Sequence, residues 1–211
     1  MRKHIVLALA ASLLTLLPLS HSATTQPAPI PERTVGPTNA AVTIEVFTDF
    51  QCPGCRELAL QTLPHVIDDY CNKGTVRLIH REFPLNRPDH KYSREAARWA
   101  VTCALFGKYD AVAELLFLRQ QVWGTTGNIE GTLSTLLTPA EMQKVKQAMN
   151  ARKADVEAAI NHDQSLIMAT GAGITTPTII VRKNGVVISR TEGFVSYPLL
   201  KRHLDEVLAR R

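Results

Sequence analysis

Apolar residues along this chain follow two kinds of spacing. Short runs of β-branched and apolar residues predict strands at 42–47, 75–79, 178–181 and 186–189. Longer stretches in which apolar residues recur every three or four positions predict helices after Cys52, at 92–120, at 139–170 and from Tyr197. An Asn-Gly pair between the last two strands is typical of a hairpin turn. The first strand, helix and strand in succession favour a parallel pair.

The order of these elements predicts an α/β fold. We expect one folded domain at 41–211, with a helical subdomain inserted at about 88–170. Hydrophobic residues make up 45% of the 211 positions, which is enough for one sizeable core. The formal net charge is +5, but Lys and Arg are scattered among acidic residues, so we expect no nucleic-acid partner. The histidines lack ligand spacing to one another and predict no metal site.

The N-terminus has a pattern of its own. A basic start at 1–4 precedes an apolar run at 5–19 and the small residues Ser20, Ser22 and Ala23. This order is typical of a secretory signal peptide, predicted here over 1–23, with an uncleaved anchor as the alternative. The run is shorter than the roughly 20 residues that span a bilayer. Residues 24–40 are rich in proline and predict an extended linker, so we expect a periplasmic or secreted protein.

A Cys-Pro-Gly-Cys sequence, Cys52 to Cys55, lies where a strand becomes a helix. Both sulfurs then share one face of the first turn and can form a disulfide. At the positive end of the helix dipole, the pKa of the Cys52 thiol should fall below about 8.5, which makes it a nucleophile and a good leaving group. Pro53 suits the first helical position. Gly54 adds no side chain to stabilise the thiolate, so we expect a smaller shift than a histidine there would give.

The four cysteines also allow a zinc site or structural disulfides. Cys55 and Cys71 have a separation found in some zinc sites, but a helix between them would place them roughly 24 Å apart, too far for one ion. An inert structural disulfide is the simpler alternative for Cys52 and Cys55. In an oxidising compartment, leftover cysteines tend to pair, so we expect a structural disulfide between Cys71 and Cys103. A buried, unpaired Cys103 on an apolar helical face is the alternative.

The segment Phe47-Thr48-Asp49-Phe50-Gln51-Cys52-Pro53-Gly54-Cys55, together with Thr176-Pro177 before a strand, resembles the DsbA-type thiol:disulfide oxidoreductases. The resemblance spans the chain from Val42 to the C-terminal helix. It implies a thioredoxin fold with a helical insertion, no metal or organic cofactor, and a cis proline at Pro177. It further implies that Cys52 attacks and Cys55 resolves. The substrate would be bound by Pro53, Gly54, Thr176 and Pro177.

One position departs from the thioredoxin-like pattern. A buried acid usually lies six residues before the first active-site cysteine, and here that residue is Val46. Glu45 is adjacent, but in a strand it points to the opposite face. Such an acid accepts the proton of the resolving thiol when the protein reduces a substrate, so its absence favours oxidation.

The resulting hypothesis is a dithiol oxidase that introduces disulfides into exported proteins, with reoxidation by a membrane quinone-linked partner that the resemblance implies. The first alternative is a disulfide isomerase or reductase of the same fold. Related isomerases carry an N-terminal dimerisation region, and the short linker leaves no room for one, so we expect a monomer. The second alternative is a redox-inactive chaperone or a module that binds a soft metal such as Cu(I).

Overall fold

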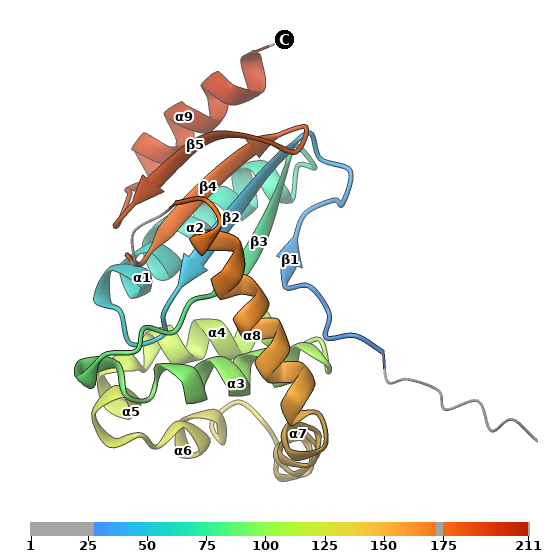
Figure 1. Cartoon of the computed structure of the whole chain (residues 1–211), viewed down its shortest axis with the longest axis vertical. Helices are drawn as coiled ribbons and strands as arrows, with labels where there is room; N and C mark the ends of the chain where they lie inside the picture. The colour runs from blue at the N-terminus through green and yellow to red at the C-terminus, as the bar shows by residue number, and fades with distance from the viewer. Residues whose placement is uncertain (1–27, 172–174, 211) are drawn as a thin grey trace, which may run out of the picture.

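The computed structural model describes residues 28–171 and 175–210 (Figure 1). The predicted signal peptide and the start of the predicted linker lie outside these residues. Within the described ranges, no helix combines the length and apolar character that crossing a membrane would need.

A five-stranded sheet forms the centre of the molecule, in the order β1-β3-β2-β4-β5. Its strands are β1 Thr34–Val35, β2 Val42–Thr48, β3 Val76–Glu82, β4 Thr178–Lys183 and β5 Val186–Glu192. The β2–β3 pair is parallel, and the other neighbours are antiparallel. At the predicted hairpin turn, Asn184 and Gly185 adopt positive φ angles of 51° and 81°, as such tight turns require. The predicted α/β fold class is confirmed.

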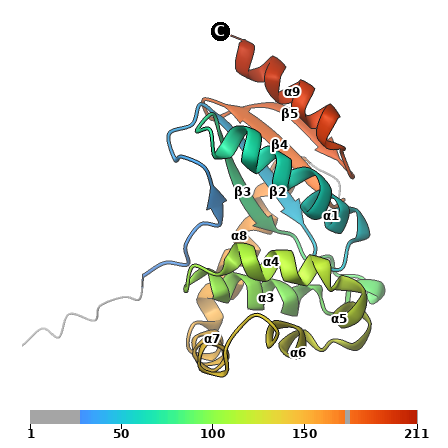
Figure 2. The same ribbon diagram turned by 180° about the vertical axis from the view of Figure 1, so that it is seen from behind.

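One face of the sheet is covered by the helix that follows β2 and by the C-terminal helix. The first of these is continuous and has four parts: α1 Pro53–Glu57, the π-helical η1 Leu58–Thr62, α2 Leu63–Val66 and the π-helical η2 Ile67–Cys71. The C-terminal helix is α9 Tyr197–Ala209. Figure 2 shows both in front of this face. Leu58, Val66 and Leu204 pack here against the apolar side chains of β2 and β3.

Among the described residues between β3 and β4, the chain forms six α-helices and a short 3-10 turn. They are η3 Pro88–His90, α3 Ser93–Ala104, α4 Tyr109–Leu118, α5 Gln120–Thr126, α6 Ile129–Leu133, α7 Pro139–Ala151 and α8 Lys153–Met168. Helices α3 to α7 form a separate layer at one end of the sheet, while α8 crosses the face opposite α1 (Figure 1). The helix expected to run through 92–120 is broken at Gly107, whose φ of 66° is left-handed.

The described part of the predicted linker is packed on the fold, which corrects the expectation of an extended tether for it. Strand β1 pairs with β3 through Thr34 and Ile79. Ile30 packs against the apolar side chains of α3 and α8. The buried Arg33 side chain forms an ion pair with Asp163 of α8. A short strand, one apolar side chain and one buried charge thus hold this segment in place.

Candidate active site

Cys52 and Cys55 lie at the turn where β2 passes into α1. Cys52 is the N-cap of α1, with φ −74° and ψ 122°, and Pro53 occupies the first turn. The Cys52 residue is 8% exposed, whereas Cys55 is completely buried. Both are free thiols in this structure. The predicted position at a strand-to-helix junction is the one observed.

The two thiols differ strongly in acidity. The pKa of Cys52 is lowered from 9.0 to about 6, above all by a hydrogen bond from the Cys55 thiol; burial opposes this shift. The backbone N–H groups of Gly54 and Cys55 lower it further. Burial and the neighbouring Cys52 raise the pKa of Cys55 well above its ordinary value. At neutral pH the pair therefore holds one thiolate, at Cys52, and one thiol, at Cys55.

The Thr176–Pro177 segment faces this pair. Its peptide bond is cis. The Thr176 carbonyl oxygen lies 3.3 Å from Cys52 Sγ, and its buried hydroxyl has no protein hydrogen-bond partner. A Cβ atom on Gly54 would lie 3.3 Å from Pro177 Cδ, so the start of α1 and this loop are in close contact. The structure thus brings together all six residues predicted for catalysis and substrate binding.

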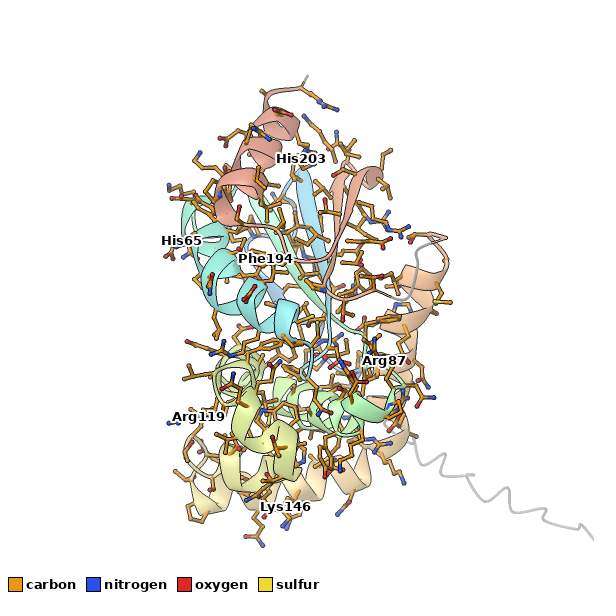
Figure 3. All side chains as sticks on the ribbon, turned by 90° about the vertical axis from the view of Figure 1, so that its left-hand side faces the viewer. His65, Arg87, Arg119, Lys146, Phe194 and His203 are labelled. Atoms are coloured by element: carbon orange, nitrogen blue, oxygen red, sulfur yellow. The ribbon has the colours of Figure 1, made fainter. Side chains whose placement is uncertain are left out.

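An exposed aromatic side chain adjoins the same place. Phe194, labelled in Figure 3, follows β5 and remains 42% exposed. Its Cβ lies 4.0 Å from the position that a Cβ on Gly54 would take. Sequence reasoning missed Phe194, because nothing local connects it with a motif about 140 residues away.

The structure does not bring Cys71 and Cys103 together, which corrects the expectation of a structural disulfide. Both are free thiols. Cys71 ends the long first helix and packs in the core beside the sheet, whereas Cys103 lies in α3 and shares the core of the helical layer with Cys55. Cys71 lies at the far end of the helix that begins beside Cys55, and it is in a different core from Cys103. Each thiol acts as a small buried apolar group.

The turn before Cys52 is fixed by a buried carboxylate that sequence reasoning left without a role. Asp49 is 1% exposed. Its oxygens accept hydrogen bonds from Gln51 N (2.6 Å), Leu85 N (2.7 Å) and Ser93 Oγ (2.6 Å), and lie 2.9 Å from His90 Nδ1. The backbone N–H of Asp49 donates to Cys55 Sγ at 3.4 Å. The sequence signal for this role was an acidic residue directly after a strand expected to be buried, because a buried carboxylate needs hydrogen-bond partners.

Two glutamine side chains join the same turn to the helical layer. Gln51 Oε1 accepts from Tyr92 N at 2.6 Å, and its Nε2 donates to Gly124 O at 3.1 Å. Gln120 Nε2 donates to the carbonyl oxygens of Phe50 (2.8 Å) and Cys52 (2.9 Å). The turn that carries Cys52 is therefore held between the sheet and the inserted helices.

The position six residues before Cys52, which usually carries a buried acid in thioredoxin-like proteins, holds an apolar residue here. Val46 is completely buried, and Glu45 points to the opposite face, where it forms ion pairs with Arg81 (2.8 Å) and Arg182 (2.6 Å). The buried acid on the Val46 face is Glu82 of β3, whose backbone partner on β2 is Thr48. Burial raises the pKa of Glu82 to about 7.

The described residues contain no group of three or more His, Cys, Asp and Glu side chains arranged to hold a metal ion. Cys52 and Cys55 lie close enough for a hydrogen bond between their sulfurs. A thiolate and an adjacent buried thiol can exchange with a disulfide.

Comparisons with known proteins agree with this geometry. Residues 29–197 match the family model described as thioredoxin. A thioredoxin-like oxidoreductase from Silicibacter pomeroyi has a similar structure, with a TM-score of 0.67, 25% identity, and coverage of 85% of this chain and 94% of that one. BdbD from Bacillus subtilis gives a TM-score of 0.68 at 22% identity, with coverage of 85% and 94%. α-DsbA1 from Wolbachia pipientis gives 0.67 at 18% identity, with coverage of 92% and 94%.

Among curated sequences, a probable disulfide bond formation protein D from Bacillus cereus is 36% identical over 53 residues. The match covers 25% of this chain and 24% of that protein, so it spans about a quarter of the relative's length. The Bacillus anthracis protein of the same description matches equally. The predicted thioredoxin-like fold, with DsbA-type proteins among its structural neighbours, is confirmed.

Proposed function

The chain belongs to the thioredoxin family, and we propose that it is a DsbA-type thiol:disulfide oxidoreductase with Cys52 and Cys55 as its redox pair. One observation carries the proposal: at the start of a helix, a thiol with a pKa of about 6 adjoins a buried thiol whose pKa is raised. This asymmetry suits thiol–disulfide exchange, because one sulfur attacks or leaves as a thiolate while the other keeps its proton.

We further propose that the protein works as an oxidase. A substrate thiolate attacks Cys52 Sγ of the oxidised pair; the Cys52–Cys55 bond breaks, and its electron pair moves to Cys55, which takes up a proton. A second substrate thiolate then attacks the substrate sulfur of the mixed disulfide, and Cys52 leaves as a thiolate. The substrate loses two electrons and two protons. The cysteine pair gains both electrons and one proton, and the other proton enters the solvent.

The direction of transfer follows from the stability of the reduced pair. Stabilising the Cys52 thiolate favours the reduced form and so makes the oxidised form a stronger oxidant. Val46 offers no proton acceptor at the usual place, and Glu45 is held by arginines on the other face. The absence of an acid at this position favours the oxidase over a reductase, which would need a proton acceptor for Cys55.

The substrates we propose are exported proteins with free cysteine pairs. An extended substrate segment would lie along Thr176 and Pro177, over Pro53 and Gly54, with its sulfur at Cys52. The N-terminal pattern favours a periplasmic or secreted protein, and the exchange needs no metal or organic cofactor. Reoxidation falls to a membrane quinone-linked partner, and the protein acts as a monomer.

The test is the reduction potential of the Cys52/Cys55 pair, obtained by equilibrating the purified protein with glutathione. An oxidase should give about −120 to −180 mV, and a value near −270 mV would identify a reductant instead. A Cys55→Ser variant should form a mixed disulfide with a peptide whose two cysteines are joined by a disulfide, because the Cys52 thiolate attacks one peptide sulfur and the other leaves as a thiolate; Cys52→Ser should not. Absence of exchange would leave the redox-inactive chaperone or Cu(I)-binding alternative.

A further inference from the structure

Gln120 lies at a break between two helices of the inserted layer. Arg119, between α4 and α5, has φ −99° and ψ 14°, so the helix is interrupted there and α5 begins at Gln120. The Gln120 side chain turns inward and is 7% exposed. Buried amides normally occur where they satisfy other buried polar groups.

The amide of Gln120 bonds to the backbone of the active-site turn at two points. Its Nε2 lies 2.8 Å from Phe50 O and 2.9 Å from Cys52 O, so both N–H groups are used and the orientation of the amide is fixed. The Cys52 carbonyl also accepts from Arg56 N at 3.1 Å, within the first turn of α1. The Phe50 ring packs against Phe117 of α4 with centroids 4.8 Å apart. The helical layer thus holds the residues on both sides of Gln51.

We propose that Gln120 is a positioning residue that tunes the acidity of Cys52 and thereby the oxidising strength of the pair; the inference rests on the redox function proposed above. By donating to the Phe50 and Cys52 carbonyls, Gln120 fixes the turn and keeps the N–H groups of Gly54 and Cys55 directed at Cys52 Sγ. These N–H groups form the positive end of α1 that stabilises the thiolate.

This contribution differs between the two redox forms. In the reduced form Cys52 carries a negative charge that the polarised helix end stabilises, whereas the disulfide form carries no such charge. Gln120 therefore favours reduction of the pair, and its effect should require an ionised Cys52. A side chain that merely packs or holds the fold together would act at every pH.

The experiment compares two variants with a matched control. Gln120→Met keeps an unbranched chain of similar length but removes both donors, and Gln120→Glu keeps the shape but offers at most one donor. Gln121→Met makes the same change at the exposed neighbouring position of α5. The readouts are the pKa of Cys52, followed by thiolate absorbance near 240 nm, and the equilibrium constant with glutathione at pH 5 and pH 8.

Loss of the two donors should raise the pKa of Cys52 by about 0.5 to 1 unit. The equilibrium constant for oxidation of glutathione by the cysteine pair should then fall about three- to tenfold at pH 8. Gln120→Glu should shift the pKa at least as far. At pH 5, where Cys52 is largely protonated, each variant should approach the wild type, and Gln121→Met should match it throughout.

An unchanged Cys52 pKa, or a change in the equilibrium constant that is equal at pH 5 and pH 8, would overturn the inference and leave Gln120 with a packing role. A wild-type protein that fails to exchange with glutathione would instead overturn the proposed function. The two failures are therefore distinguishable.

Discussion

Acidification should lower the unfolding free energy of the reduced protein, because it protonates the Cys52 thiolate. The folded-state pKa of about 6 lies below the ordinary 9.0, so the unfolded chain binds more protons between these values. Stability from this group is complete above pH 9 and is lost as the pH falls through 6. The Cys52→Ala variant lacks this contribution, so the difference in unfolding free energy between wild type and variant should shrink from pH 8 to pH 5.

The size of the effect follows from the two pKa values. Linkage gives about 2.7 kcal/mol at pH 8 and nearly zero at pH 5. Because Cys52 is only partly enclosed by the protein, solvent screens its charge, and we discount the change to about 1 to 1.5 kcal/mol. Other titrating groups, which wild type and variant share, largely cancel in the difference.

The assay is urea unfolding of wild type and Cys52→Ala at pH 5, 6, 7 and 8 with a non-thiol reductant. Cys103→Ala is the matched control, because burial raises the pKa of Cys103 to about 12 and that thiol stays neutral over the whole range. Its difference from wild type should not depend on pH. A Cys52→Ala difference that is equally independent of pH would refute the assignment of a stabilised thiolate.

Three further outcomes are expected. Gly54→His should lower the pKa of Cys52, seen as thiolate absorbance at lower pH, because an imidazolium would stabilise the thiolate; a rise would contradict this. Burial raises the pKa of Glu82 from 4.5 to about 7, so the native state binds more protons between these values and its stability falls as pH rises through them. Glu82→Gln should flatten that fall in urea unfolding, and an unchanged profile would contradict the assignment. In a variant with both active-site cysteines replaced by serine, a reductant should leave Tm unchanged because Cys71 and Cys103 are unbonded; a lower Tm would reveal a disulfide.

Local signals sufficed where a segment's own residues determine its structure. The alternation and β-branching of β2 and the Asn-Gly turn needed no distant partner to be recognised. Strand β3 was predicted to end at Ile79 but continues to Glu82, because its polar last residues gain strand geometry by pairing with β2. The break at Gly107 was missed since apolar spacing continues on both sides of it.

The position of Cys52 and Cys55 at the start of a helix could be predicted because the pair lies within four consecutive residues. Its surroundings could not, because they come from distant parts of the chain: Gln120 is 68 residues from Cys52, and Thr176 is 124 residues away. The packed N-terminal segment was misjudged for the same reason. Arg33 forms a hydrogen bond with Asp163, 130 residues later in the chain, and the residues around Arg33 do not indicate that partner.

The central position of β2 has a kinetic consequence. It emerges early in synthesis, yet one of its two neighbours, β4, lies beyond the whole helical insertion. Pairing strands so far apart in the sequence raises the contact order, costs loop-closure entropy and slows folding. Until residues 178–183 have been made, an apolar strand keeps one edge unpaired, and such an edge is a template for aggregation. The length of the helical insertion therefore sets how long that edge stays exposed while the chain is being made.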